Sequence, residues 1–287
     1  MSKKITAGYN GSEASSEAVR WAANEARTRG VPLRVVTCPD LPPTTSAAAF
    51  GTGAVYDAER SLAEVNAETV RSMIGESHPE VALVVDIVPG SPTSALLEGL
   101  EPHDLVAVGA SSHEGAALFW VGSTTRHLAH HSPCPVVVVR GAASRGTPDR
   151  VVVGVDGSES SDAALRWAAD EADLHGAELV VVHAWDYPYR PTDVGSAQGH
   201  DITEVDAACT LDTAVEAARE RCAATVTPAL VEGGPVDALL QTARDGDLLV
   251  VGSRGRGALR SRIFGSTANS VLDAAAVPVV IVRPDDA

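Results

Sequence analysis

Residues 150–176 read RVVVGVDGSESSDAALRWAADEADLHG, a run of β-branched residues followed by a segment rich in alanine. The run Arg150–Val155 is typical of a buried strand, whereas Ser160–His175 carries its apolar residues at helical spacing. A serine ahead of the helix provides a cap, and Gly176 follows the last periodic residue, where glycine commonly ends a helix. These residues therefore predict a strand followed directly by a helix.

The same alternation continues to the end of the chain. Four further apolar runs are predicted strands: Glu178–Trp185, Thr225–Val231, Asp247–Val251 and Val277–Val282. Three predicted helices lie between them: about Ile202 to Cys222, a short helix that begins at Pro235, and Ser266–Ala275. Strands that alternate with helices indicate parallel crossovers, so the predicted fold class is α/β, with an open and mostly parallel sheet of five strands covered by helices on both faces.

The chain contains this unit twice. Two segments of each copy align without gaps, Gly8–Cys38 with Gly154–Ala184 at 16 of 31 positions and Gly109–Arg140 with Gly252–Arg283 at 9 of 32. Between the copies, Gly141–Asp149 is small and polar and contains glycine and proline, which is linker composition. We therefore predict two tandem domains, residues 1–145 and 146–287, each with its own five-stranded sheet.

Composition excludes several classes of protein. Hydrophobic residues make up 45% of the 287 residues and charged residues 21%, which is globular composition and not that of a disordered chain. The net charge of −16 repels phosphodiesters and anionic lipids, so we expect no nucleic acid and no membrane partner. The only lysines are Lys3 and Lys4, which removes a Walker-type P-loop and Schiff-base catalysis. No apolar run approaches the roughly 20 residues of a membrane span, and we expect a cytoplasmic protein.

Glycines follow the fourth predicted strand of the second copy in a regular pattern. Gly252 and Gly255 are followed, after nine residues, by Gly265-Ser266-Thr267 at the start of a helix. Glycines let the backbone approach phosphate oxygens, and the free N–H groups of a helix start favour an anion. Four arginines lie in the same stretch: Arg254, Arg256, Arg260 and Arg262. In an acidic domain this basic cluster indicates a bound polyanion; the alternative is a solvated loop with an ordinary helix cap.

These motifs carry a family resemblance. The glycine spacing, preceded by Val-Gly-Val-Asp-Gly-Ser at Val153–Ser158, resembles the ATP-binding subgroup of the universal stress proteins, and the doubling resembles their tandem form. The resemblance covers nearly the whole chain and implies a Rossmann-like sheet of the adenine nucleotide alpha hydrolase type. It implies that Asp156 contacts adenosine and that the backbone at Ala184 lines the adenine pocket. The residues implied to hold ribose and phosphates are Gly252, Gly255, Gly265, Ser266 and Thr267. For Asp156, the alternative is an Asx turn or helix cap.

The first copy departs from this pattern. Asn10 stands at the position of Asp156, and Ser112 replaces the second glycine, so the motif reads Gly109-x2-Ser112-x9-Gly122-Ser123-Thr124. Asparagine loses the charge of the carboxylate, and serine adds a Cβ where backbone and phosphate should approach. The loop His113–Val121 also lacks the arginines. We therefore expect a weaker nucleotide site in the first copy, or one with a different ligand.

Histidines and cysteines give no metal site by this reasoning. His127, His130 and His131 have the i, i+3, i+4 spacing that brings imidazoles to one metal ion, but no nearby acid or cysteine completes the set. Histidine near a helix C-terminus is also favoured by the helix dipole. We expect no metal held by side chains, and Mg²⁺ only together with bound ATP. The four cysteines have no zinc-site spacing and are expected to be reduced thiols in apolar packing.

Three classes of function remain. By resemblance, the chain is an adenine-nucleotide-binding stress or regulatory module that acts on an unknown protein partner. The second class is a slow ATPase or a nucleotide-dependent transferase, although the sequence shows no unambiguous base or metal carboxylate for it. The third is a nucleotide-free interaction protein or a flavin-binding relative. An absorbance spectrum of the purified protein distinguishes adenine from flavin.

The fifth strands suggest how the copies associate. Pro135–Arg140 and Pro278–Arg283 read PVVVVR and PVVIVR, and such apolar strands are unsuited to an exposed sheet edge. By resemblance, we expect the two halves to pair internally through these strands in antiparallel orientation. A further homodimer is an open possibility of the same kind.

Overall fold

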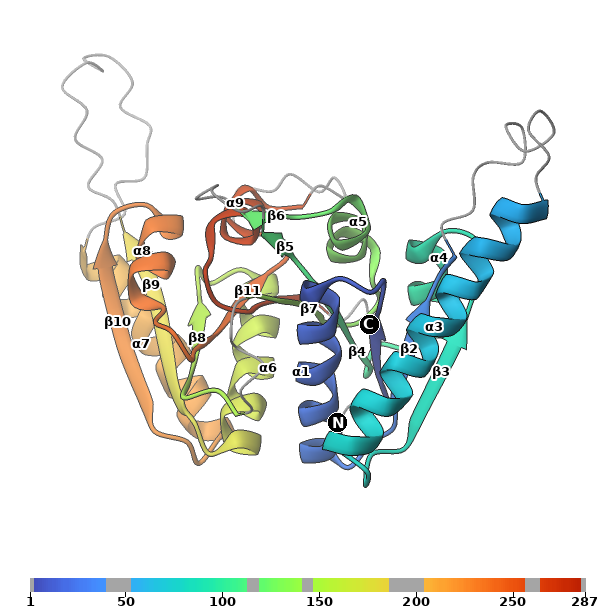
Figure 1. Ribbon diagram of the computed structural model, residues 1–287. Helices are drawn as coiled ribbons and strands as arrows, with labels where there is room; N and C mark the ends of the chain where they lie inside the picture. Colours follow the sequence, from blue (N-terminus) through green and yellow to red (C-terminus); the bar gives the residue numbers. More distant parts are fainter. Residues whose placement is uncertain are drawn as a thin grey trace, which may run out of the picture. The chain divides into compact units, whose positions relative to one another are not determined.

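The computed structural model describes residues 3–39, 53–112, 119–140, 147–185, 204–255 and 264–284. The chain divides into two compact units, Met1–Gly146 and Thr147–Ala287, coloured from blue to green and from green to red in Figure 1. The two units have the same architecture, and each is taken by itself below.

The first unit is built around a parallel sheet of five strands. Its elements in chain order are β1 (Ile5–Gly8), α1 (Glu13–Arg29), β2 (Leu33–Thr37), α3 (Gly53–Ser77), β3 (Leu83–Ile87), α4 (Pro92–Leu97), β4 (Leu105–Gly109), β5 (Ser111–Ser112), β6 (Phe119–Trp120), α5 (Ser123–His131) and β7 (Val136–Val139). The strand order within this unit is β7-β4-β1-β2-β3, and every neighbouring pair is parallel. The last strand of the unit, β7, therefore lies at one end of that order.

The second unit repeats this order. Its elements are β8 (Arg150–Gly154), α6 (Glu159–His175), β9 (Glu178–Trp185), α7 (Glu204–Arg221), β10 (Val226–Glu232), α8 (Pro235–Thr242), β11 (Leu248–Gly252), α9 (Ser266–Ala274) and β12 (Val279–Val282). The order β12-β11-β8-β9-β10 is again parallel throughout. The α/β fold class, with five parallel strands per copy, is confirmed.

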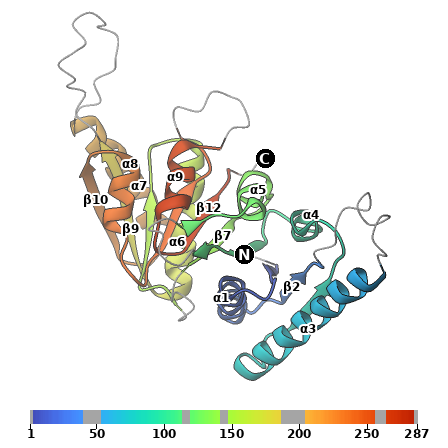
Figure 2. The ribbon, with the colours of Figure 1, turned by 45° about the horizontal axis from the view of Figure 1, so that its top comes forward.

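Helices cover both faces of the second sheet. Helices α6 and α7 pack against each other and on the sheet, and α8 and α9 do the same on the opposite face (Figure 2). Strands β8, β9, β11 and β12 are largely buried between these layers, with leucine, valine and isoleucine side chains in β11 and β12, whereas β10 is mostly half-buried or exposed. A strand that is covered on both faces needs such a continuous apolar run, which is why the sequence signal was strong.

Local capping defines the first helix of each unit. In α6, the Ser158 hydroxyl accepts a hydrogen bond from the Ser161 N–H (3.2 Å), and Gly176 ends the helix at φ 63°. Glycine reaches this left-handed conformation without the steric penalty of a Cβ. Helix α1 has the equivalent cap and end at Ser12 and Gly30. Both ends of α6 thus lie within a residue or two of the predicted ones.

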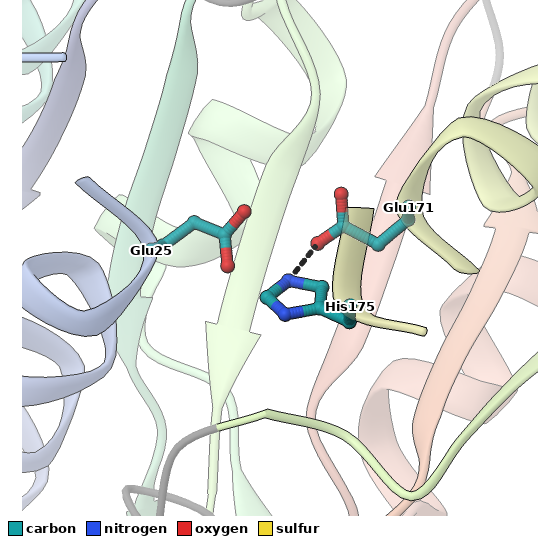
Figure 3. A group of neighbouring side chains, drawn as sticks. All are labelled: Glu25, Glu171 and His175. Carbon is teal, nitrogen blue, oxygen red and sulfur yellow. Dashed lines mark ion pairs between the residues drawn. The ribbon is translucent and has the colours of Figure 1, made fainter. Parts of the chain in front are cut away.

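The same two helices differ in one ion pair near their C-termini. On α6, Glu171 and His175 are one turn apart, with 3.3 Å between Oε1 and Nε2 (Figure 3). On α1, the corresponding acid is Glu25, and its partner one turn later is Arg29. The repeat therefore keeps the acid and exchanges a permanent cation for a histidine, which is charged only when protonated.

The first unit contains a short strand pair that the sequence did not predict. In the first unit, β5 and β6 form an antiparallel pair with Ser112 opposite Phe119, where the sequence was interpreted as a loop. The aromatic pair Phe119-Trp120 has strand propensity, but two residues are too short for a periodic signal.

Among the helices of the described ranges, none combines the length and the hydropathy that crossing a bilayer requires.

Candidate functional site

The candidate site lies at the carboxyl edge of the second sheet. Strand β8 has β9 on one side and β11 on the other, so the chain order reverses between β8 and β11. Open parallel sheets bind ligands outside the carboxyl ends of their strands at such a reversal. The loops after β8 and β11 both start there, and they contain most of the residues singled out in the sequence.

The loop after β8 is a tight turn organised by Asp156. Its Oδ1 accepts a hydrogen bond from the Ser158 N–H (3.0 Å), and Gly157 adopts φ 70°. This is the Asx turn that the sequence offered as the alternative for Asp156. The turn uses Oδ1 of this carboxylate.

The second oxygen of Asp156 faces the glycine loop. A Cβ placed on Gly255 would lie 2.7 Å from Asp156 Oδ2, which is closer than real Cβ contacts. The motif after β8 and the motif after β11 therefore meet at this point. The structure also supplies a reason for glycine at position 255 that the sequence did not indicate: the carboxylate occupies the space of a side chain.

Two serines anchor the start of the glycine loop. The Ser160 hydroxyl, on the first turn of α6, accepts a hydrogen bond from the Arg254 N–H (3.1 Å) and lies 3.4 Å from the Ser253 hydroxyl. Both serines are buried. The Gly265 N–H donates to the Ser253 carbonyl (2.8 Å), which ties the end of the loop to its beginning. The loop is therefore fastened at both ends by hydrogen bonds within the second unit.

Sequence reasoning missed these serines. In the aligned repeat, Ser160 corresponds to Ala14 and Ser253 to Ala110, so both hydroxyls are absent from the first unit. The sequence did contain a sign of their contact, because both positions have serine in the second copy and alanine in the first. It could not be recognised without knowing that α6 and the end of β11 are in contact.

The N-terminus of α9 has no side-chain cap among the residues that the structure describes. Gly265 is the N-cap, with extended φ and ψ and no side chain to accept a hydrogen bond from the first turn. Ser266 and Thr267 are the first two helical residues, and the first turn contains no acid. Such a helix start carries partial positive charge and unused N–H donors, which suits an anion. In the first unit, Gly122, Ser123 and Thr124 begin α5 in the same way.

The first glycine of each motif serves packing. A Cβ on Gly252 would lie 2.6 Å from the Ser160 carbonyl oxygen, and one on Gly109 would collide with the Ala14 carbonyl oxygen. In both units this glycine lets the first helix pass directly over the end of the fourth strand. Its presence therefore reflects the fold, and it is not by itself a sign of a ligand.

The backbone at Ala184 is directed past the end of β8. The Val182 carbonyl faces β8 and accepts from the Val155 N–H (2.9 Å), whereas the Trp185 carbonyl faces β10 and accepts from the Gly233 N–H (2.7 Å). Backbone groups of successive strand residues alternate between the two neighbours. The N–H and C=O of Ala184 thus point to the β8 side, where β8 has ended at Gly154. They form a donor and an acceptor side by side.

Buried His183 braces this end of the sheet. Its Nδ1 lies 2.7 Å from the Val155 carbonyl oxygen, directly before Asp156. A ring nitrogen can bond a carbonyl only as an N–H donor, which places the proton on Nδ1 in the neutral ring. The side chain therefore links β9 to the turn that carries Asp156.

The first unit uses its corresponding residues differently. Asn10 Oδ1 accepts from both the N–H (3.1 Å) and the hydroxyl (2.7 Å) of Ser12, so its oxygen is taken up by the turn. Cys38 stands at the position of Ala184, and partial burial raises the pKa of its thiol. The backbone of Ser112 belongs to β5. Of the other predicted contacts in the second unit, Arg254 is half-buried near the site, whereas Arg256, Arg260 and Arg262 lie outside the described residues.

All four cysteines are free thiols, but the expectation of apolar packing is wrong for Cys209, which lies on the exposed side of α7. Cys134 and Cys222 are buried, Cys38 is half-buried and Cys209 is exposed. Burial raises the pKa of Cys134 to about 11, although the Ser132 hydroxyl opposes this by a hydrogen bond. A thiol with such a pKa is protonated at neutral pH and is a poor nucleophile and metal ligand.

The fold and the site together define a class of protein. A doubly wound parallel sheet whose chain order reverses at its centre, present twice in one chain, defines a tandem α/β protein of the Rossmann-like type. The family model described as the universal stress protein family matches residues 1–140 and 148–283. The chain belongs to the universal stress protein family.

Curated relatives share the tandem organisation over nearly their whole length. Universal stress protein Rv2005c of Mycobacterium tuberculosis is 30% identical over 291 residues, which cover 97% of this chain and 96% of that protein. Universal stress protein Rv2623 of the same species is 30% identical over 295 residues, with the same coverage. These are similar proteins of the same family and domain organisation.

Solved structures agree on the fold. A universal stress protein from Archaeoglobus fulgidus covers 99% of both chains with a TM-score of 0.77 at 20% identity. Two further universal stress protein structures, in complex with cAMP and with dAMP, cover 48% and 47% of this chain at 30% and 29% identity, with TM-scores of 0.38 and 0.37. The bound nucleotides are properties of those two proteins.

Proposed function

We propose that the second unit binds ATP and that the chain acts as a nucleotide-responsive stress or regulatory module. The observation that carries this proposal is the meeting of the two loops. Gly255 lies against the Asp156 carboxylate, so one motif presents an acid and the other presents glycine amides and a helix start at the same edge of the sheet. A carboxylate suits ribose hydroxyls, and the amides suit phosphates.

Adenine is the base that fits the backbone of Ala184. The exposed edge of this residue offers one N–H donor and one C=O acceptor, directed past the end of β8. Adenine presents N1 as an acceptor beside the N6 amino donor, which is the complementary pair. Guanine presents an N1–H donor beside the O6 acceptor, so in the same orientation a donor would face the Ala184 N–H and an acceptor would face its C=O. The proposal therefore includes a preference for ATP over GTP.

The phosphates are assigned to the start of α9. The amides of Ser266 and Thr267 lie on a first turn without a side-chain cap or an acid, and the loop that leads there is fastened by Ser160. Arg254 adds a positive charge at the same edge. Mg²⁺ would enter with the nucleotide, bound through phosphate oxygens, and the proposal assigns it no protein ligand.

The first unit is proposed to bind nucleotide more weakly. Its Asn10 side chain carries no charge, and its oxygen accepts from the N–H and the hydroxyl of Ser12, whereas Asp156 has a charged carboxylate whose Oδ2 lies next to Gly255. The cytoplasmic location, the internal pairing through the fifth strands and a homodimer stay predictions from the sequence.

Isothermal titration of the full-length chain with ATP and GTP tests the proposal. We expect saturable ATP binding, weaker binding of GTP, and a loss of ATP affinity of at least tenfold in Asp156→Ala. Asn10→Ala is the matched control in the first unit and should leave the tightest site unchanged. Absence of ATP binding, or an equal loss in both variants, contradicts the proposal. Phosphate release measured in parallel shows whether bound ATP is hydrolysed.

A further inference from the structure

A pair of histidines lies on the exposed face of α5, in the turns that follow the helix start at Ser123 and Thr124. His127 and His131 are one helical turn apart, both are exposed, and their rings are stacked with centroids 4.1 Å apart and an interplanar angle of 23°. Residues at i and i+4 share one helix face, so the helix itself brings the two imidazoles together. Two neutral imidazoles side by side are a familiar donor set for transition metals.

A hydrogen bond orients the second histidine for this chemistry. His131 Nδ1 lies 3.0 Å from the His127 carbonyl oxygen. Because a carbonyl only accepts, Nδ1 carries the proton, and the lone pair of the neutral ring is on Nε2. Metal-binding histidines commonly donate their other N–H to a carbonyl in this way, which fixes the tautomer and the ring orientation. This contact was not visible in the sequence, which predicted no metal site on α5.

The separation of the rings suits one ion. Two nitrogens bound to the same zinc-sized ion at about 2.0–2.1 Å lie roughly 3.0–3.5 Å apart. In the structure the rings are stacked with their centroids 4.1 Å apart, so their in-plane lone pairs are nearly parallel, and binding one ion requires the side chains to rotate until the two lone pairs converge. Both side chains are exposed, and the helix already places them on one face. No third acid, cysteine or histidine of the described residues joins the pair in a compact ligand group, so water would complete the coordination.

We propose that His127 and His131 bind one divalent transition-metal ion of the class that prefers imidazole, namely Ni²⁺, Cu²⁺ or Zn²⁺. The ion bridges two consecutive turns of α5 through the Nε2 atom of His131 and a ring nitrogen of His127. The proposal is independent of nucleotide binding, because both histidines follow the helix start that would hold phosphate. Hard ions such as Mg²⁺ prefer oxygen ligands and are not expected to bind there.

The test is a calorimetric titration of the untagged full-length protein with Ni²⁺ at pH 7.5, without nucleotide. The unfolding temperature is measured with and without Ni²⁺. We expect one saturable site, a rise in the unfolding temperature that chelator reverses, and at least tenfold weaker binding in His127→Ala and in His131→Ala. Removing either ligand leaves a single imidazole and abolishes chelation. Both side chains are exposed, so circular dichroism of these variants should match that of the parent.

His130→Ala is the matched control. His130 lies on the same helix with its ring centroid 6.0 Å from that of His131, but it is not a member of the i, i+4 pair. This variant should keep the parental Ni²⁺ affinity. The proposal is overturned if the parent shows no saturable Ni²⁺ site, if the His127 and His131 variants keep parental affinity, or if His130→Ala loses as much affinity as they do.

Discussion

Replacement of Gly255 by alanine tests how the two loops of the proposed nucleotide site act together. Gly255 is not in the left-handed region, so alanine introduces no backbone strain. Its methyl group would lie 2.7 Å from Asp156 Oδ2, whereas ordinary contacts begin near 3.4 Å. The half-exposed carboxylate must therefore move by several tenths of an ångström, and it can do so towards solvent. We expect the free energy of unfolding to fall by about 1 kcal/mol or less.

The effect on ATP affinity should be larger. A hydrogen bond to a charged group contributes about 1.5–3 kcal/mol, which corresponds to roughly 10- to 150-fold in affinity when the carboxylate is displaced. Asp156→Ala removes the same interaction by deletion. The double variant should therefore bind ATP no more weakly than Asp156→Ala alone, and the two changes should be strongly non-additive.

The assay is calorimetric titration of the parent, both single variants and the double variant with ATP, with urea unfolding of each as the control for folding. Additive losses would refute the reasoning. They would mean that the methyl group acts directly on the phosphates and that the contact between Gly255 and Asp156 plays no part in binding.

Three further predictions concern packing and reactivity. Gly252→Ala should lower the free energy of unfolding by about 1–3 kcal/mol in urea melts, because its methyl group would lie against the backbone of Ser160. Gly122→Ala meets no described residue within 4 Å and should cost less, about 1 kcal/mol or below, because it only replaces glycine at the N-cap of α5. Equal effects would contradict this assignment. Ser160→Ala removes the acceptor of the Arg254 N–H, so it should lower the free energy of unfolding by about 1–3 kcal/mol in the same assay and weaken ATP binding. An unchanged free energy of unfolding would show that water or another group accepts this hydrogen bond instead. Burial raises the pKa of Cys134 to about 11, so only about one Cys134 thiol in a thousand is ionised at pH 8. Iodoacetamide should therefore label exposed Cys209 first and Cys134 only after unfolding, as measured by peptide mass spectrometry. Rapid labelling of Cys134 in the native protein would contradict this prediction.

The sequence by itself determined the elements and their repetition. Strands such as Leu248–Gly252 are covered on both faces, so their residues are almost uniformly apolar, and such runs are recognised without knowledge of their neighbours. The ends of α6 were equally readable, because caps such as Ser158 and Gly176 depend on backbone groups within a few residues. The candidate site was readable to the extent that glycine spacing and a helix start are local features.

Only the tertiary structure decided what several of those residues do. Gly252 is required by the passage of α6 over β11, and Gly255 by the carboxylate of Asp156, about a hundred positions away in the chain. Ser160 and Arg254, which are 94 positions apart in the chain, are joined by a hydrogen bond. A contact between distant segments leaves no periodic or spacing signal, because each residue is compatible locally with many surroundings. The roles of these residues depend on the carboxyl ends of β8 and β11 lying at one edge of the sheet, and that arrangement depends on the packing of the whole sheet.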